Sequence, residues 1–248
     1  MGDKRFWLGL FGLGLLGAAL YSLLFLDMVQ IQAIEIKGAH FISEENVRQE
    51  VQNQLPYRWA LMKTASAFFV PTQRIQEQLQ KRFTEIKNVS IQRPLFDTNR
   101  IVVSVQERRP VAVWCGSNTQ CFVIDEEGIA FLPTSEQHSL VRISAFTEQK
   151  EATLGQQVVE NVYLEPLLSF YEIFSKGNFP SRLEFQIDSV NLLASQLAEV
   201  QTKEGWQIRF TIQEDIAWQA TKARAALSEK ISIQERSQLE YIDVRFGD

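Results

Sequence analysis

Side chains that could act as nucleophiles or metal ligands are few, because the chain contains 2 cysteines and 2 histidines. Cys115 and Cys121 flank a short loop between two apolar runs, so they either close this loop as a disulfide or remain thiols. His40 and His138 lie far apart in the sequence, in polar, turn-like contexts. A histidine that met a cysteine in space would form a nucleophile and base pair. Because each cysteine has the other as its nearer partner, we do not predict such a pair.

Other kinds of catalytic or metal site also lack support in the sequence. A zinc site needs more ligands than these cysteines and a distant histidine provide. The sequence contains no nucleophile elbow, phosphate-binding loop, zinc-protease helix motif or dinucleotide-binding glycine motif. Helix capping and turn formation explain the acidic pairs, which are Glu44-Glu45, Glu126-Glu127 and Glu214-Asp215. We therefore predict a protein that is not an enzyme and that holds no cofactor or metal.

The charge of the chain indicates which kinds of partner it can bind. The net charge is −5, from 25 basic and 30 acidic residues that are spread along the chain without a basic stripe. A nucleic-acid-binding surface would need such a stripe. We therefore expect no nucleic-acid partner.

An uncharged apolar stretch covers residues 6–26. As a helix it would span roughly 31 Å, close to the roughly 30 Å hydrocarbon core of a bilayer. Lys4 and Arg5 precede it and Asp27 follows, which favours a cytoplasmic N-terminus. A cleavable signal peptide is the alternative, but the small residues 17–19 are followed by further apolar residues. We predict a cytoplasmic tail at 1–5, a transmembrane helix at 6–26 and an exported remainder that is periplasmic or extracellular.

The next 80 or so residues show a regular order of signals. The sequence predicts a strand over 29–37, helices from Glu44 (capped by Ser43) and from Thr72, and two strands around 89–91 and 101–105. The apolar, aromatic connection at 55–70 is either a lipid-facing surface or packing beneath the helices, and we favour the packing. This order predicts a three-stranded sheet covered on one face by two helices.

The second half is richer in strand signals. A hairpin is predicted over 122–131, and strands over 183–187, 197–201 and 206–212. A helix is predicted over 159–175, where Pro166 should kink or restart it. Asp215 should cap another helix that runs to about Lys230. We therefore predict an α+β fold with two exported domains, a first at 29–107 and a strand-rich, mixed α/β domain at 108–248.

Four strings in the correct order resemble those of one family. They are the strand and glycine at 34–38, the segment 86–93, the string VSVQERRPVA at 103–112 and the hairpin 122–131. The segment YIDVRF at 241–246 follows a predicted helix. On these residues, and on the anchor before them, the chain resembles the FtsQ/DivIB family of bacterial cell division proteins. The resemblance implies that the domain at 29–107 is a POTRA domain.

The resemblance also implies a function. FtsQ is a non-enzymatic protein of the cell (inner) membrane and the division septum. It scaffolds the divisome by binding the FtsB and FtsL pair outside the membrane, and so helps to control septal peptidoglycan synthesis by FtsW and FtsI. The alternative is a membrane-anchored POTRA-type chaperone or secretion component. One POTRA-like unit, with no room for a barrel after it, disfavours that alternative.

Two candidate surfaces follow from the resemblance. The strand that would bind FtsB contains Tyr241, Asp243, Arg245 and Phe246. A recruitment surface in the POTRA domain would contain Val89, Ile91 and Arg93. The family usually has another short strand after the segment that ends in Arg-Phe, whereas this sequence ends at Asp248. Either the sequence is truncated or residues 239–246 form the docking edge, and we hypothesise the second.

Overall fold

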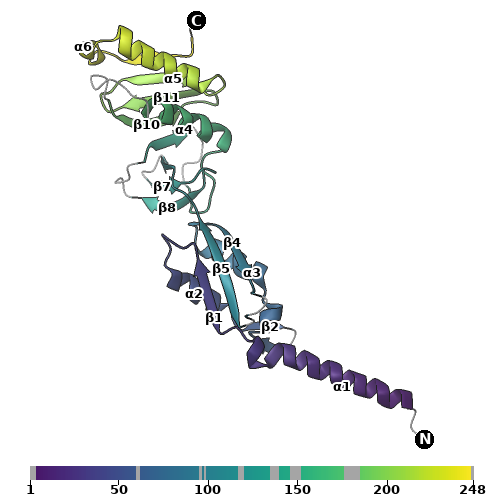
Figure 1. Ribbon diagram of the computed structural model, residues 1–248. Coiled ribbons are helices and arrows are strands. Elements are labelled where there is room, and N and C mark those ends of the chain that lie inside the picture. Colours follow the sequence, from purple (N-terminus) through teal and green to yellow (C-terminus); the bar gives the residue numbers. More distant parts are fainter. Residues whose placement is uncertain are drawn as a thin grey trace. The chain divides into compact units, whose positions relative to one another are not determined.

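A computed structural model describes residues 4–59, 62–94, 97, 99–116, 120–134, 140–145, 152–175 and 185–246. The chain divides into two compact units, Met1–Arg108 and Arg109–Asp248. Each unit has its own hydrophobic core. Figure 1 shows the helices and strands of both units.

Unit 1 contains one long helix followed by a small α/β domain. Its elements in chain order are α1 (Lys4–Phe25), the 3-10 turn η1 (Asp27–Val29), β1 (Ala33–Lys37), α2 (Glu44–Asn53), β2 (Tyr57–Trp59), β3 (Met62–Thr64), the 3-10 turn η2 (Ala67–Phe69), α3 (Thr72–Arg82), β4 (Ile86–Gln92) and β5 (Arg100–Glu107).

Helix α1 covers nearly all of the predicted transmembrane stretch. Residues Phe6–Phe25 form a helix long and apolar enough to cross a membrane, and nearly all of its side chains are exposed. A helix that is apolar all round and unpacked is typical of a membrane span. This helix suggests a single-pass membrane protein.

The predicted order of strand, helix, helix, strand and strand is confirmed. The sheet has the order β1-β5-β4, in which β1 is parallel and β4 antiparallel to the central β5. Both helices bury apolar side chains at helical spacing, Val47 and Val51 from α2 and Ile75 and Leu79 from α3. The first strand starts at Ala33 rather than at Val29, because η1 occupies the chain just after α1.

The connection at 55–70 has more structure than the sequence indicated. It contains the hairpin of β2 and β3, in which Arg58 lies directly opposite Lys63, followed by η2. Ala67 and Val70 are buried as expected, whereas Phe68 is 48% exposed. Packing therefore accounts for only part of this segment.

Unit 2 is built around one large sheet. Its elements are β6 (Ala112–Cys115), β7 (Cys121–Ile124), β8 (Ala130–Thr134), β9 (Arg142–Ala145), α4 (Asn161–Ser175), β10 (Ile187–Leu192), β11 (Leu197–Thr202), β12 (Gln207–Thr211), α5 (Ile216–Ala225), π-helical turns η4 (Ala226–Lys230), α6 (Ile233–Arg236) and β13 (Tyr241–Asp243). The strands form an 8-stranded sheet in the order β13-β12-β11-β10-β9-β6-β7-β8.

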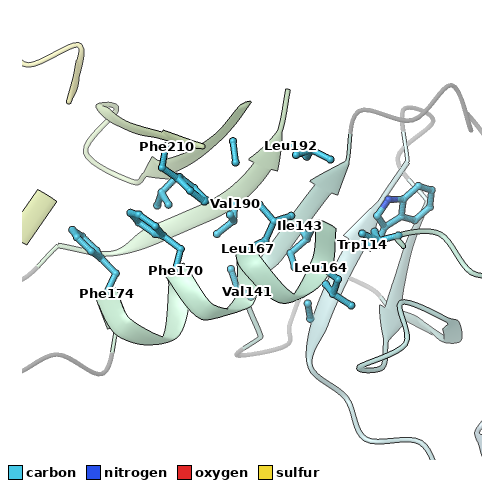
Figure 2. Close-up of a cluster of buried hydrophobic side chains, with 14 of the residues drawn as sticks. Trp114, Val141, Ile143, Leu164, Leu167, Phe170, Phe174, Val190, Leu192 and Phe210 are labelled. Atoms are coloured by element: carbon cyan, nitrogen blue, oxygen red, sulfur yellow. The ribbon is translucent and has the colours of Figure 1, made fainter. Parts of the chain in front are cut away.

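Helix α4 supplies several large apolar side chains of the second core. Leu164, Leu167, Phe170 and Phe174 lie along one face of α4, which packs against the central strands (Figure 2). The ring centroids of Phe170 and Phe210 on β12 are 4.1 Å apart. Helix α5 contacts both α4 and β12. The two helices therefore pack into one core together with the sheet.

Some predicted elements of unit 2 differ in their bounds. Pro166 does not end α4, which runs on to Ser175, because the loss of one N–H near its first turns leaves the later hydrogen bonds intact. The strand predicted at 183–187 begins only at Ile187, and residues 183 and 184 lie outside the described residues. The hairpin, the strands at 197–202 and 207–211 and the helix after Asp215 are as predicted.

Candidate partner-binding edge

The last strand described, β13, lies at one edge of the large sheet and pairs only with β12. The two strands are parallel, with Gln207 opposite Tyr241 and Arg209 opposite Asp243. The N–H of Gln207 donates to the carbonyl of Glu240, and the N–H of Val244 donates to the carbonyl of Arg209, both at 3.0 Å. Because main-chain groups alternate in direction along a strand, those of Tyr241 and Asp243 point away from β12.

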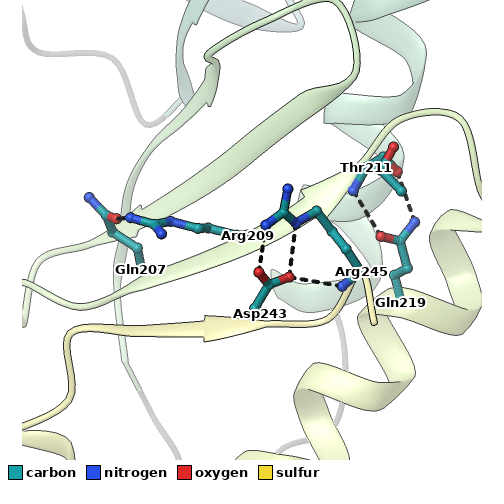
Figure 3. Close-up of polar contacts among 6 residues, drawn as sticks. All are labelled: Gln207, Arg209, Thr211, Gln219, Asp243 and Arg245. Carbon is teal, nitrogen blue, oxygen red and sulfur yellow. Dashed lines mark hydrogen bonds and ion pairs between the residues drawn. The ribbon is translucent and has the colours of Figure 1, made fainter. Parts of the chain in front are cut away.

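The side chains of Asp243 and Arg245 close this edge at its C-terminal end. The Asp243 carboxylate accepts from Arg245 Nε at 2.9 Å and from a terminal guanidinium nitrogen at 2.6 Å (Figure 3). It also accepts from the main-chain N–H of Arg245 at 3.1 Å. These hydrogen bonds from Arg245 lower the pKa of the Asp243 carboxyl, against the opposing effect of partial burial. The outward main-chain groups left for another strand are those of Tyr241 and Asp243.

Aromatic rings with cations beside them flank β13. Tyr241 is 45% exposed, and the Arg209 guanidinium lies 4.1 Å from its ring centroid. Phe246 is 73% exposed, with the Arg245 guanidinium 4.9 Å from its ring centroid. A large aromatic ring that is exposed beside an open strand edge is typical of an interaction surface.

A surface pocket adjoins Phe246. It has a volume of about 460 Å³ and is lined by the turn before β11, the residues after β12, Arg245 and Phe246. On the adjacent helix, the Lys222 ammonium lies 3.9 Å from the Trp218 ring centroid and donates to the carbonyl of Phe246. These contacts hold the last described residues against α5.

Sequence reasoning missed two residues that position this edge. Gln219, only 2% exposed, accepts from the N–H of Thr211 at 2.9 Å and donates to the carbonyl of Thr211 at 2.8 Å, which fixes the end of β12 to α5. Arg209 lies opposite Asp243 on β12, with its guanidinium beside the Tyr241 ring. Neither residue belongs to a sequence motif, because each contact joins side chains or main chain of different elements of the fold. Asp215, which was predicted as a cap, does accept from the N–H of Trp218.

The opposite edge of the same sheet, β8, is partly covered. The N–H of Ala130 donates to the carbonyl of Gln156, and the N–H of Gly155 donates to the carbonyl of Ala130. Pro133 also has no N–H to offer. Within the described residues, β13 is therefore the better template for an added strand.

The residues predicted as a recruitment surface lie on or just after β4, at an edge of the sheet in unit 1. Val89 and Ile91 are half-buried against the core of that unit. The outward carbonyls of Lys87 and Val89 accept from the side chains of Gln80 and Gln76, both on α3. Arg93 donates to the carbonyls of Ala67 and Phe68, at 2.7 and 2.9 Å. Side chains therefore already occupy part of this edge.

Several of the residues considered for chemistry make structural contacts. Cys115 and Cys121 form a disulfide across the β6–β7 hairpin. His138 lies outside the described residues, and among the residues that the structure describes there is no group of three or more histidine, cysteine, aspartate or glutamate side chains that could hold a metal ion. Glu44 occupies the first turn of α2, and Asp125 accepts from the N–H groups of Glu127 and Ile129 in the turn before β8.

Comparison with protein families identifies the domain that follows α1 in unit 1. The model of the POTRA domain, FtsQ-type, matches residues 29–108. These residues are an FtsQ-type POTRA domain. This domain, with the apolar helix α1 before it, is consistent with an FtsQ/DivIB-like protein, as the sequence resemblance predicted. A comparison with curated protein sequences found no match.

The presence of this domain supports a general conclusion about function. FtsQ-type POTRA domains belong to proteins that are associated with cell division, that act through protein–protein interactions and that are generally non-enzymatic. This domain type also suggests the division septum as the location.

Proposed function

We propose that this protein is a non-enzymatic scaffold of the septal divisome that binds an FtsB- and FtsL-type pair through the β13 edge. The single observation that carries the proposal is the outward main chain of Tyr241 and Asp243, in a chain that also contains an FtsQ-type POTRA domain. A strand from the partner would complete the sheet by main-chain hydrogen bonds. Through this pair the protein would help to control septal peptidoglycan synthesis by FtsW and FtsI.

The side chains around β13 supply specificity in this proposal. Tyr241 and Phe246 provide apolar contact area, and the pocket beside Phe246 can take a side chain of the added strand. Asp243 and Arg245 hold the edge in its present geometry. The N-terminus of α1 would lie in the cytoplasm, and the POTRA domain and unit 2 would lie on the outer side of the cell (inner) membrane.

Site-specific crosslinking in dividing cells tests the edge. We would place a photoreactive residue at Tyr241 and, as a matched control, at Leu132 on the opposite edge strand β8. We expect an FtsB adduct from position 241 and a much weaker one from position 132. Adducts from 132 alone, or equal yields from both positions, would contradict docking at β13.

The cellular role needs a separate experiment. Depletion of the protein in growing cells should produce filaments, and a fluorescent fusion should form a band at midcell. Normal division with uniform envelope fluorescence would reject the division role and favour an export-associated POTRA protein.

A further inference from the structure

The C-terminal end of helix α1 is held by the body of unit 1. The last carbonyls of a helix have no partner within the helix, and here side chains supply them. Leu24 O accepts from Gln30 Nε2 at 2.7 Å and from Thr64 Oγ1 at 2.5 Å, and Leu23 O accepts from Ser66 Oγ at 2.5 Å. Thr64, Ser66 and Leu24 are all buried. The segment that contains the β2–β3 hairpin and η2 therefore lies directly at the end of the helix.

This contact places the hairpin at a defined depth if α1 crosses a bilayer. The uncharged stretch ends just before Asp27, so the last turn of α1 would lie where the hydrocarbon core meets the headgroups. The side chains of Thr64 and Ser66 bond to that last turn. Strands β2 and β3 cannot be far from the same headgroup layer.

The exposed side chains of this segment fit a phospholipid surface. Arg58 and Lys63 lie directly opposite each other in the hairpin and are exposed, and neither forms an ion pair or hydrogen bond within the described part of the chain. Like charges that face each other across two strands destabilise a hairpin unless an anion lies near them. Lipid phosphates would supply that anion, and basic residues close to an anionic leaflet are attracted to it.

The same segment carries an exposed aromatic side chain. Phe68 in η2 is 48% exposed, and Arg93 holds the turn in place through the carbonyls of Ala67 and Phe68. Basic and aromatic residues in one short segment are typical of an interfacial contact.

We propose that the β2–β3 hairpin and η2 rest on the phospholipid headgroups of the leaflet at which α1 ends, with Arg58 and Lys63 on lipid phosphates and Phe68 at the acyl boundary. The POTRA domain then has a second membrane contact in addition to its anchor. This inference requires that α1 spans the bilayer, and it does not depend on any division partner.

Photocrosslinking to lipid tests the proposal with the full chain in nanodiscs. Benzoylphenylalanine replaces Phe68 in one variant and, as the matched control, Phe41 in another. Phe41 is 76% exposed in the same unit, but it follows the end of β1 that lies away from α1. A third variant carries the probe at Leu15, in the middle of α1, and reports whether the helix is in lipid.

In nanodiscs that contain phosphatidylglycerol, we expect lipid adducts from positions 15 and 68 and few from position 41. The Arg58→Gln/Lys63→Gln double variant, or pure phosphatidylcholine, should lower the yield at position 68 roughly five-fold or more while the yield at position 15 is unchanged. Equal yields at 68 and 41 would overturn the membrane contact. A yield at 68 that is unchanged by neutralisation and by lipid charge would overturn the role of the phosphates. Absence of adducts at 15 would overturn the spanning helix and the inference with it.

Discussion

Asp243 and Arg245 form two side-chain hydrogen bonds, at 2.9 and 2.6 Å, directly after the strand edge that we propose as a docking site. The same carboxylate also binds the N–H of Arg245. The pair thus removes one main-chain donor from the outward row and sets where an added strand must stop.

The first prediction concerns this pair. Asp243→Asn should lower the free energy of unfolding of unit 2 by up to about 1 kcal/mol, because the pair is partly exposed and screened by solvent. The pKa of Asp243 is lowered in the folded state, so the stabilisation is present above its ordinary pKa and is lost as the pH falls through the lowered value. Urea unfolding of both proteins at neutral and at acid pH measures this, and the two curves should converge in acid. A difference that grows in acid would contradict the assignment.

The second prediction concerns Glu107 at the exit of the POTRA domain. Its carboxylate accepts from the N–H groups of His40, Phe41 and Ile42, at 2.9, 3.0 and 2.9 Å. Partial burial acts to raise the pKa of Glu107, but these N–H donors outweigh it, so the folded pKa is lowered. Glu107→Gln should therefore destabilise unit 1 by about 1–3 kcal/mol above the ordinary carboxyl pKa.

Amide hydrogen exchange measures the effect of Glu107→Gln. The protection factors of residues 40–42 should fall in this variant, and those of the wild-type protein should fall in the same way as the pH drops through the lowered pKa of Glu107. Gln106→Ala is a matched control, because Gln106 is the exposed neighbour on the same strand. Unchanged exchange at 40–42 in Glu107→Gln would show that the carboxylate does not hold this turn.

The third prediction concerns the buried Gln219. Gln219→Ala removes both hydrogen bonds to Thr211 and leaves two partly buried main-chain groups without their partner, which should cost about 1–3 kcal/mol. The end of β12 should loosen, and crosslinking at Tyr241 should fall as well. Gln234→Ala, at an exposed position of α6, should change neither. A stable Gln219→Ala protein with normal crosslinking would remove Gln219 from the support of the edge.

The fourth prediction concerns the core beneath the sheet. Phe170 is fully buried and stacks on Phe210 at 4.1 Å, so Phe170→Ala should cost about 3–5 kcal/mol through the cavity it leaves. Thermal unfolding measures this. Val162→Ala, at an exposed position of the same helix, serves as the control and should have little effect. Equal effects would mean that α4 does not pack as described.

The sequence was sufficient where a local pattern decided the structure. The alternation of Ile101, Val103 and Val105 predicted β5, and Asp215 predicted the start of α5. It was insufficient where the deciding contact joined distant segments. Glu107 binds amides more than sixty residues away, and Gln219 acts on a strand outside its own helix.

Short elements were also missed. Strands β2 and β3 have three residues each, too few for an alternating pattern to be recognised. The edge strand β13 is likewise limited to Tyr241–Asp243, only part of the segment 239–246 that was predicted as the docking edge. Pairing with β12, rather than side-chain periodicity, sets its length.

The side chains of Gln76 and Gln80 have a consequence for crowding. Proteins confined to a membrane meet one another in two dimensions at high local concentration. Unpaired strand edges would then allow the sheets of neighbouring copies to pair. Because these two glutamines bond to carbonyls of the β4 edge, POTRA domains can gather closely without joining their sheets there.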